Sequence, residues 1–167
     1  GGDTPSPVPA ALFDIFATCR YVGLGCAAVV TVAASPSSEE SRNVVVDMEE
    51  VIYTMFMSYQ ECLYKAGLQL DSTFHIRFFY TIGTNDDNED EDGMRLRQTV
   101  QSVVGSIWKR GNHPACSMVP VQGILLSHNQ QEGDSLKTQS CGWAMQIMAA
   151  DLLHMETDLW VHHHQTT

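Results

Sequence analysis

Asn112-His113-Pro114-Ala115-Cys116-Ser117-Met118-Val119-Pro120-Val121 is the stretch of sequence that decides the fold. Its second half begins a predicted strand that runs from Ser117 to Leu126. His113 precedes Pro114 at the connection from a helix into this strand, where a solvated loop histidine is expected. Cys116 carries a short thiol that is mostly neutral at pH 7 and a weak donor. An inert packing cysteine is the first interpretation of Cys116, and a reactive thiol is the second.

The rest of the chain supplies further elements on both sides of this stretch. Residues 16–34 predict two strands joined at a glycine turn, residues 23–25. A strand over residues 73–82 follows the first helix, with Phe74, Ile76, Phe78, Tyr80 and Ile82 on one face. A second helix is predicted over residues 94–109, and a last strand over residues 142–150 after a loop, residues 127–140. The first helix has an apolar stripe that ends before Gly67, made of Met48, Val51, Ile52, Met55, Phe56, Tyr59, Cys62, Leu63 and Ala66.

The predicted order is therefore ββαβαββ. Each helix has one apolar stripe to bury, and the sheet has one face to cover it. The fold class is α+β, a mixed sheet with two helices packed on one face.

Composition limits the classes of function. The chain has 167 residues, 44% hydrophobic and 17% charged, which predicts one domain over residues 13–155 between a proline-rich linker or cloning remnant (1–12) and a C-terminal tail (156–167). No apolar run approaches the roughly 20 residues of a membrane helix. The net charge is −11, with nine Lys and Arg against twenty acids, so no basic patch for nucleic acid is expected. Five cysteines without a Cys-x-x-Cys pair favour a reducing, cytoplasmic location over a disulfide framework or zinc site.

Neither a metal nor a cofactor is expected. The acidic run from Asp86 to Asp92 contains Asn88-x-Asp90-x-Asp92-Gly93, which matches the first half of a calcium loop. Thr99 stands where the bidentate glutamate should be, so a solvated acidic loop is the preferred interpretation. The run from His162 to His164 is expected to be a frayed tail or tag remnant, with weak metal binding as the alternative.

Several segments together resemble the RidA/YjgF (endoribonuclease L-PSP) family. The first helix ends in Ala66-Gly67, the next strand contains Phe79-Tyr80-Thr81, and Pro114-Ala115-x-Ser117-x-Val119 follows the second helix. Family members usually have Pro-Ala-Arg-Ser at that point. The resemblance implies the RidA/chorismate-mutase-like fold and hydrolysis of 2-imino acids, in which the arginine holds the substrate carboxylate and a glutamate on the last strand positions water.

Both of these family positions are changed in this chain. Cys116 replaces the arginine and cannot hold a carboxylate through two parallel hydrogen bonds. Gln146 replaces the glutamate and cannot act as a general base. The isolated domain is therefore expected to be non-catalytic, and a deaminase with relocated catalytic groups is the alternative. The candidate ligand cleft consists of Cys116, Ser117, Met118, Gln146 and Thr99.

The resemblance also implies partners. RidA-family domains typically form trimers, so a homo-trimer or pairing with a sister RidA-like domain is expected. The proline-rich start and altered positions are similar to the RidA-like domains that follow the ATP-dependent amidating domain of eukaryotic diphthine-ammonia ligases. Through such a parent enzyme, the partner would be elongation factor 2.

Overall fold

The computed structural model describes residues 13–22, 27–36, 47–81, 89–109, 112–129 and 136–151. The predicted series ββαβαββ is confirmed for the main sheet and its two helices, and a hairpin that was not predicted is inserted before the last strand. The elements are β1 Phe13–Val22, β2 Ala27–Pro36, α1 Met48–Lys65, the 3-10 turn η3 Leu70–Ser72, β3 Thr73–Thr81, α2 Glu89–Ile107, β4 Ala115–Val121, β5 Ile124–Asn129, β6 Leu136–Cys141 and β7 Trp143–Ala150.

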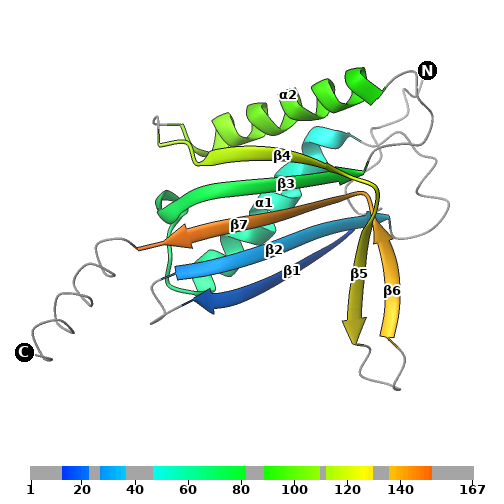
Figure 1. Ribbon diagram of the computed structural model, residues 1–167. Helices are drawn as coiled ribbons and strands as arrows, with labels where there is room; N and C mark the ends of the chain where they lie inside the picture. Colours follow the sequence, from blue (N-terminus) through cyan, green and yellow to red (C-terminus); the bar gives the residue numbers. More distant parts are fainter. Residues whose placement is uncertain are drawn as a thin grey trace, which may run out of the picture.

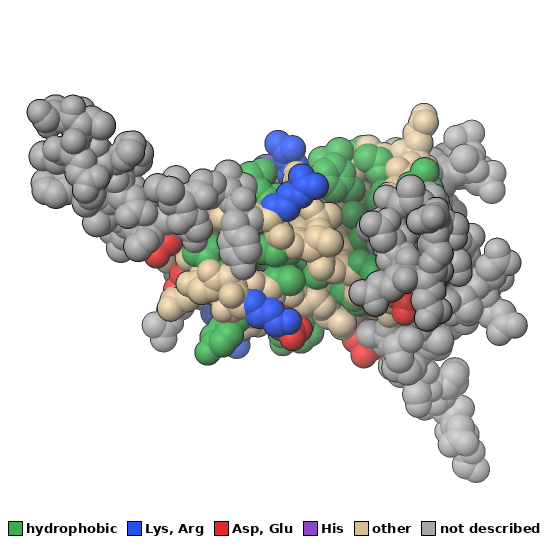
Figure 2. Space-filling model, turned by 90° about the horizontal axis from the view of Figure 1, so that it is seen from below, with side chains coloured by type: hydrophobic (Ala, Val, Ile, Leu, Met, Phe, Trp, Pro, Cys, Tyr) green, Lys and Arg blue, Asp and Glu red, His purple; other side chains and the backbone are tan. Residues whose placement is uncertain are grey.

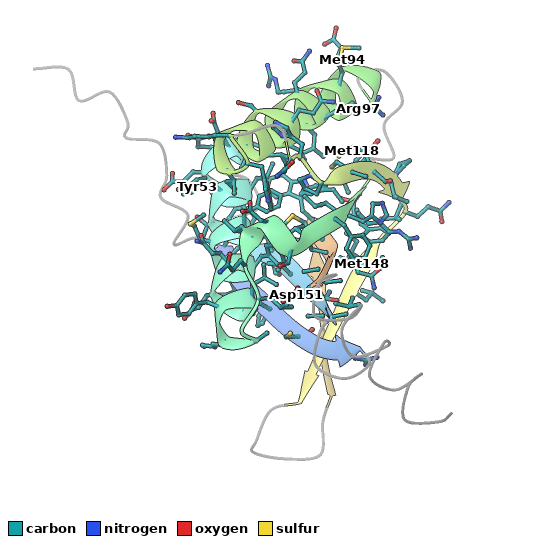
Figure 3. All side chains as sticks on the ribbon, turned by 90° about the vertical axis from the view of Figure 1, so that its left-hand side faces the viewer. Tyr53, Met94, Arg97, Met118, Met148 and Asp151 are labelled. Carbon is teal, nitrogen blue, oxygen red and sulfur yellow. The ribbon has the colours of Figure 1, made fainter. Side chains whose placement is uncertain are left out.

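Five strands form one mixed sheet in the order β1-β2-β7-β3-β4. The pair β3–β4 is parallel and the other pairs are antiparallel. Figure 1 shows α1 behind this sheet and α2 alongside the outermost strand β4. No helix of the described residues lies on the opposite side of the sheet, and we call that side the open face. Figure 3 views the same arrangement from the side, with Tyr53 of α1 on the helical side and Met148 of β7 on the open face.

Local signals at both ends of α1 explain its length. The Asp47 carboxylate accepts from the backbone N–H groups of Glu49 and Glu50, which would otherwise lack partners in the first turn. At the other end, Gly67 has a φ of 74°, a conformation that glycine adopts without steric cost. The helix predicted from the apolar stripe is confirmed.

The core lies between the helices and the helical face of the sheet. Phe56 of α1 meets Trp108, just after α2, edge to face with ring centroids 5.7 Å apart. The Trp108 indole N–H donates to the backbone carbonyl of Leu70 at 3.0 Å, so its polar atom is satisfied. The stripe of α1 is buried here through Val51, Ile52, Met55, Phe56, Tyr59 and Leu63.

One prediction about β3 is wrong at the start of the strand. Phe74 was expected on the buried face with Ile76 and Phe78, but half of its surface is exposed. The pairing with β7 shifts register between Thr73 and His75, and this irregularity turns Phe74 outward. Thr73 is buried instead, and its hydroxyl makes a 2.6 Å hydrogen bond with the Tyr59 hydroxyl.

The predictions for two other segments also need correction. The strand expected over residues 117–126 is divided at Gln122-Gly123 into β4 and β5, and most of the loop expected over residues 127–140 is the β5–β6 hairpin. A hairpin is held by backbone hydrogen bonds, which form with polar and apolar side chains alike. The polar composition of this segment therefore did not indicate strands. In Figure 1 the hairpin leaves the main sheet at a steep angle.

The second helix begins earlier than predicted, at Glu89 instead of residue 94. Part of the acidic run is therefore helical, which suits acidic residues because the start of a helix carries a partial positive charge. The acidic residues before Glu89, the turn at residues 23–25, the histidine run and both terminal segments lie outside the described residues.

The described residues contain neither a candidate membrane span nor a candidate metal cluster. No helix in that part of the chain has the length and apolar character needed to cross a membrane. Nor does that part contain a group of three or more His, Cys, Asp or Glu side chains arranged to hold a metal ion.

Candidate functional site

Cys116 lines a cavity between α2 and the edge strand β4. The cavity has a volume of about 270 Å³. Arg97, Val100 and Gln101 line it from the helix, and Cys116 and Met118 line it from the strand. Figure 3 shows Arg97 and Met118 next to each other at this end of the molecule. The cavity thus combines one guanidinium, one amide and one thiol with apolar walls.

The Cys116 thiol is less acidic than an ordinary thiol. Although the residue as a whole is exposed, the protein atoms around its sulfur desolvate the thiolate and raise the pKa of the thiol. A raised pKa lowers the thiolate fraction at neutral pH, and the thiolate is the nucleophile. The raised pKa argues against the reactive thiol, whereas the exposure of the residue as a whole does not match a buried packing cysteine.

Gln146 lies on the other face of the sheet from Cys116. Ile76 on β3 pairs with Cys116 on one side and with Ile147 on the other, so these residues share the helical face. Because successive residues of a strand point to opposite faces, Gln146 points to the open face. Cys116 and Gln146 therefore do not face one space within one copy of the chain.

The structure divides the candidate cleft residues into three groups. Cys116 and Met118 line the cavity against α2. Ser117 and Gln146 lie on the open face, where both are register partners of Arg77. The Thr99 hydroxyl donates to the backbone carbonyl of Arg95 within α2 at 2.8 Å, and Thr99 does not line the cavity.

A row of polar side chains crosses the open face. Thr31, Gln146, Arg77 and Ser117 are successive register partners on β2, β7, β3 and β4. Beside the row, His75 Nε2 lies 3.2 Å from the Ser117 hydroxyl oxygen, within hydrogen-bonding distance. Neither Arg77 nor His75 belongs to the candidate cleft residues predicted from the sequence. The alternation along β3 placed both on one face, but their neighbours depend on the pairing with β4 and β7, which the alternation does not specify.

A shallow groove adjoins this row where the β5–β6 hairpin leaves the sheet. Its volume is about 300 Å³, and its lining includes Thr31 and Gln146 from the polar row. Phe79 and Ile124 pack there against a small apolar cluster centred on Ala33 and Ala144. The open face therefore has an apolar groove directly beside a polar row.

Charged side chains are sparse on the side of the molecule seen in Figure 2. Green hydrophobic side chains are interspersed there with tan surface, which is backbone and the remaining side chains, and the blue Lys and Arg side chains of the described residues form no continuous band.

Comparisons with known proteins identify the fold. No protein-family model matches the sequence, and no curated protein sequence matches it. A solved structure of a “putative endoribonuclease” from Thermotoga maritima has a TM-score of 0.50 and 14% identity, covering 80% of this chain and 84% of that chain. The chain therefore has the RidA/chorismate-mutase-like α+β fold.

Two further solved structures have lower scores. One is a member of the YjgF/YER057c/UK114 family from Mycobacterium tuberculosis, with a TM-score of 0.46 and 18% identity, covering 81% of this chain and all of that chain. The other is TdcF from Escherichia coli with bound serine, with a TM-score of 0.46 and 14% identity, covering 78% of this chain and 84% of that chain.

Proposed function

We propose that this chain, with its RidA-like fold, is a non-catalytic module that serves oligomerisation, substrate docking or small-ligand binding in a multidomain enzyme. The observation that carries the proposal is the identity and placement of Cys116 and Gln146, the residues at the two catalytic positions of the family. Cys116 faces α2, and Gln146 faces the open side of the sheet. Neither side chain can perform the family's step, because a thiol does not hold a carboxylate with two parallel hydrogen bonds and an amide does not act as a base.

One observation favours the alternative, a 2-imino acid deaminase with relocated groups. Arg97 lines the same cavity as Cys116 and brings a guanidinium there from the helix. A guanidinium can hold a substrate carboxylate whether the arginine belongs to the helix α2 or to the strand β4. Among the described residues, however, the cavity lining contains no carboxylate that could act as the general base, and its amide comes from Gln101. This lining supports docking of a ligand better than hydrolysis.

The two functions are separated by an assay with freshly generated 2-iminopropanoate. The proposal predicts ammonia release at the spontaneous rate, with no change in Cys116→Ala, Gln146→Ala or Arg97→Gln. Release above that rate in the unmodified chain, lost in Arg97→Gln, would establish the deaminase with Arg97 as its carboxylate anchor. Buffer alone and heat-denatured protein give the spontaneous rate for comparison.

The assembly that we propose is a trimer of identical chains, or the equivalent with a sister RidA-like domain. The open face supports it, because a sheet with one face covered by helices leaves apolar side chains exposed on the other. Val29, Phe79, Val119 and Met148 lie on this face and are each only partly buried by the chain itself. Packing of copies against it would remove this surface from water.

For the parent enzyme, we propose a cytoplasmic diphthine-ammonia ligase acting on elongation factor 2. Its support is the resemblance of this chain to RidA-like domains with altered catalytic positions. The test is the sequence of the full transcript. An ATP-pyrophosphatase motif in the same open reading frame, and capture of elongation factor 2 by the full-length protein, would support this parent. A full-length protein without that motif would exclude it.

A further inference from the structure

Three polar side chains stand next to each other on adjacent strands of the open face. Arg77 on β3 is the register partner of Gln146 on β7 and of Ser117 on β4. Neighbouring strands lie about 4.8 Å apart, so an amide, a guanidinium and a hydroxyl occupy one row. None of these three residues lines the cavity that contains Cys116.

The positive charge of Arg77 has no negative partner in the described part of the chain. The ion pair found there joins Lys65 and Glu61 at 3.7 Å on α1. Arg77 is exposed, and its guanidinium offers five N–H donors in a planar fork. A row centred on such a group is complementary to an anion with two or more oxygens.

The histidine beside the row can orient the hydroxyl toward a bound anion. His75 Nε2 lies 3.2 Å from the Ser117 oxygen. When Nε2 carries the proton and donates it to that oxygen, the hydroxyl hydrogen of Ser117 is free to point to a third group. Ser117 can then donate to an anion that lies on the same face, beside Arg77 and Gln146.

The adjoining groove suggests the rest of the ligand. Gln146 belongs both to the polar row and to the lining of the groove of about 300 Å³. The groove continues past Ala144 and Phe79 to Ile124, and these walls are apolar. A molecule with its charged end on Arg77 therefore has an apolar surface for its other end.

We infer that the open face binds a small amphipathic oxyanion, with a carboxylate or phosphate head on Arg77, Ser117 and Gln146 and a short apolar tail in the groove beside Phe79. The site does not depend on the proposed function, since a deaminase with its centre at Cys116 would carry it as well.

Titration of the isotopically labelled full chain tests this site by nuclear magnetic resonance. The probes are acetate, hexanoate and inorganic phosphate at constant ionic strength. We expect saturable shifts at the backbone amides of Arg77, Ser117 and Gln146, and additional shifts at Phe79 and Ile124 with hexanoate alone. Hexanoate should bind at least about tenfold more tightly than acetate, because burial of its additional methylenes is favourable. Comparison of acetate with phosphate identifies the preferred head.

Matched variants decide between a site and general charge attraction. Arg77→Gln should abolish saturation, and Arg77→Lys should weaken binding because an ammonium lacks the planar fork. Arg20→Gln removes the same charge from an exposed position of the same face on β1 and should bind as the unmodified chain does. Saturable binding that survives Arg77→Gln, or no saturation with any of the three probes, would overturn the inference. The spectrum of each variant before titration shows whether it is folded.

Discussion

At the scale of single residues, the buried polar contacts show how this fold tolerates polar groups. The Tyr59 hydroxyl and the Thr73 hydroxyl lie 2.6 Å apart inside the core. Burial raises the pKa of Tyr59 above its usual range, while the hydrogen bond with Thr73 acts in the opposite direction. The phenol therefore stays neutral and serves as a donor or acceptor for Thr73.

Removal of one member of this pair should destabilise the fold. Tyr59→Phe leaves the Thr73 hydroxyl buried without its partner, at an expected cost of about 1–2 kcal/mol in the free energy of unfolding. Urea denaturation measures the change. The double variant Tyr59→Phe/Thr73→Val removes both polar groups and should be less destabilised than the sum of the two single variants. Strictly additive effects would show that the contact contributes nothing.

A second residue-scale prediction concerns the reactivity of Cys116. Because desolvation raises the pKa of this thiol, less of it is ionised at pH 7 than in the unfolded chain. Alkylation by iodoacetamide should therefore be slower in the folded chain at pH 7, and its rate should rise as the pH approaches the raised pKa. Mass spectrometry of the Cys116 peptide follows the reaction apart from the other cysteines. Labelling faster than in the unfolded chain would restore the reactive-thiol interpretation.

At the scale of elements, helices and strands with a regular apolar repeat were predicted from the sequence. Features that depend on which strands pair were not. The stripe from Met48 to Ala66 specified α1 because burial on one helical face repeats every three to four residues. The β5–β6 hairpin carries no such repeat, and it was expected to be a loop. The site shows the same division. Cys116 and Gln146 were identified because they stand at the positions of the family's arginine and glutamate. That they lie on opposite faces of the sheet follows from the register of the strands, which the identity of the two residues does not indicate.

Two glycines in helical surroundings should respond oppositely to alanine. Gly67 ends α1 with a φ of 74°, so Gly67→Ala forces an alanine into a left-handed conformation and should cost about 1 kcal/mol of stability. Gly105 lies within α2, and a Cβ added there meets no atom within 4 Å apart from its chain neighbours and the nearby backbone of its own helix. Gly105→Ala should therefore stabilise the chain by about 0.5–1 kcal/mol through lower backbone entropy in the unfolded state. Thermal unfolding of both variants tests the pair, and a stabilising Gly67→Ala would contradict the assigned end of α1.

At the scale of the whole molecule, the two faces of the sheet have different roles. The helical face is buried by α1 and α2 and holds the main core. The open face is partly covered only near Ile124 of the hairpin, within the part of the chain that the structure describes. The apolar side chains of this face can pack against a second copy of the chain. The polar row can at the same time line a pocket for an anion at the interface between the copies.

The proposed assembly makes a prediction about two methionines. Met148 lies on the open face, half-buried by its own chain, and Met94 on α2 is 61% exposed on the helical side. We expect the unmodified chain to have the mass of a trimer in light scattering. Met148→Glu should lower that mass to the monomer, because a carboxylate inside an interface must lose its hydration without a fixed partner. Met94→Glu introduces the same charge and should leave the trimer intact. A monomeric unmodified chain at high concentration, or a trimer that survives Met148→Glu, would show that the open face is not the interface.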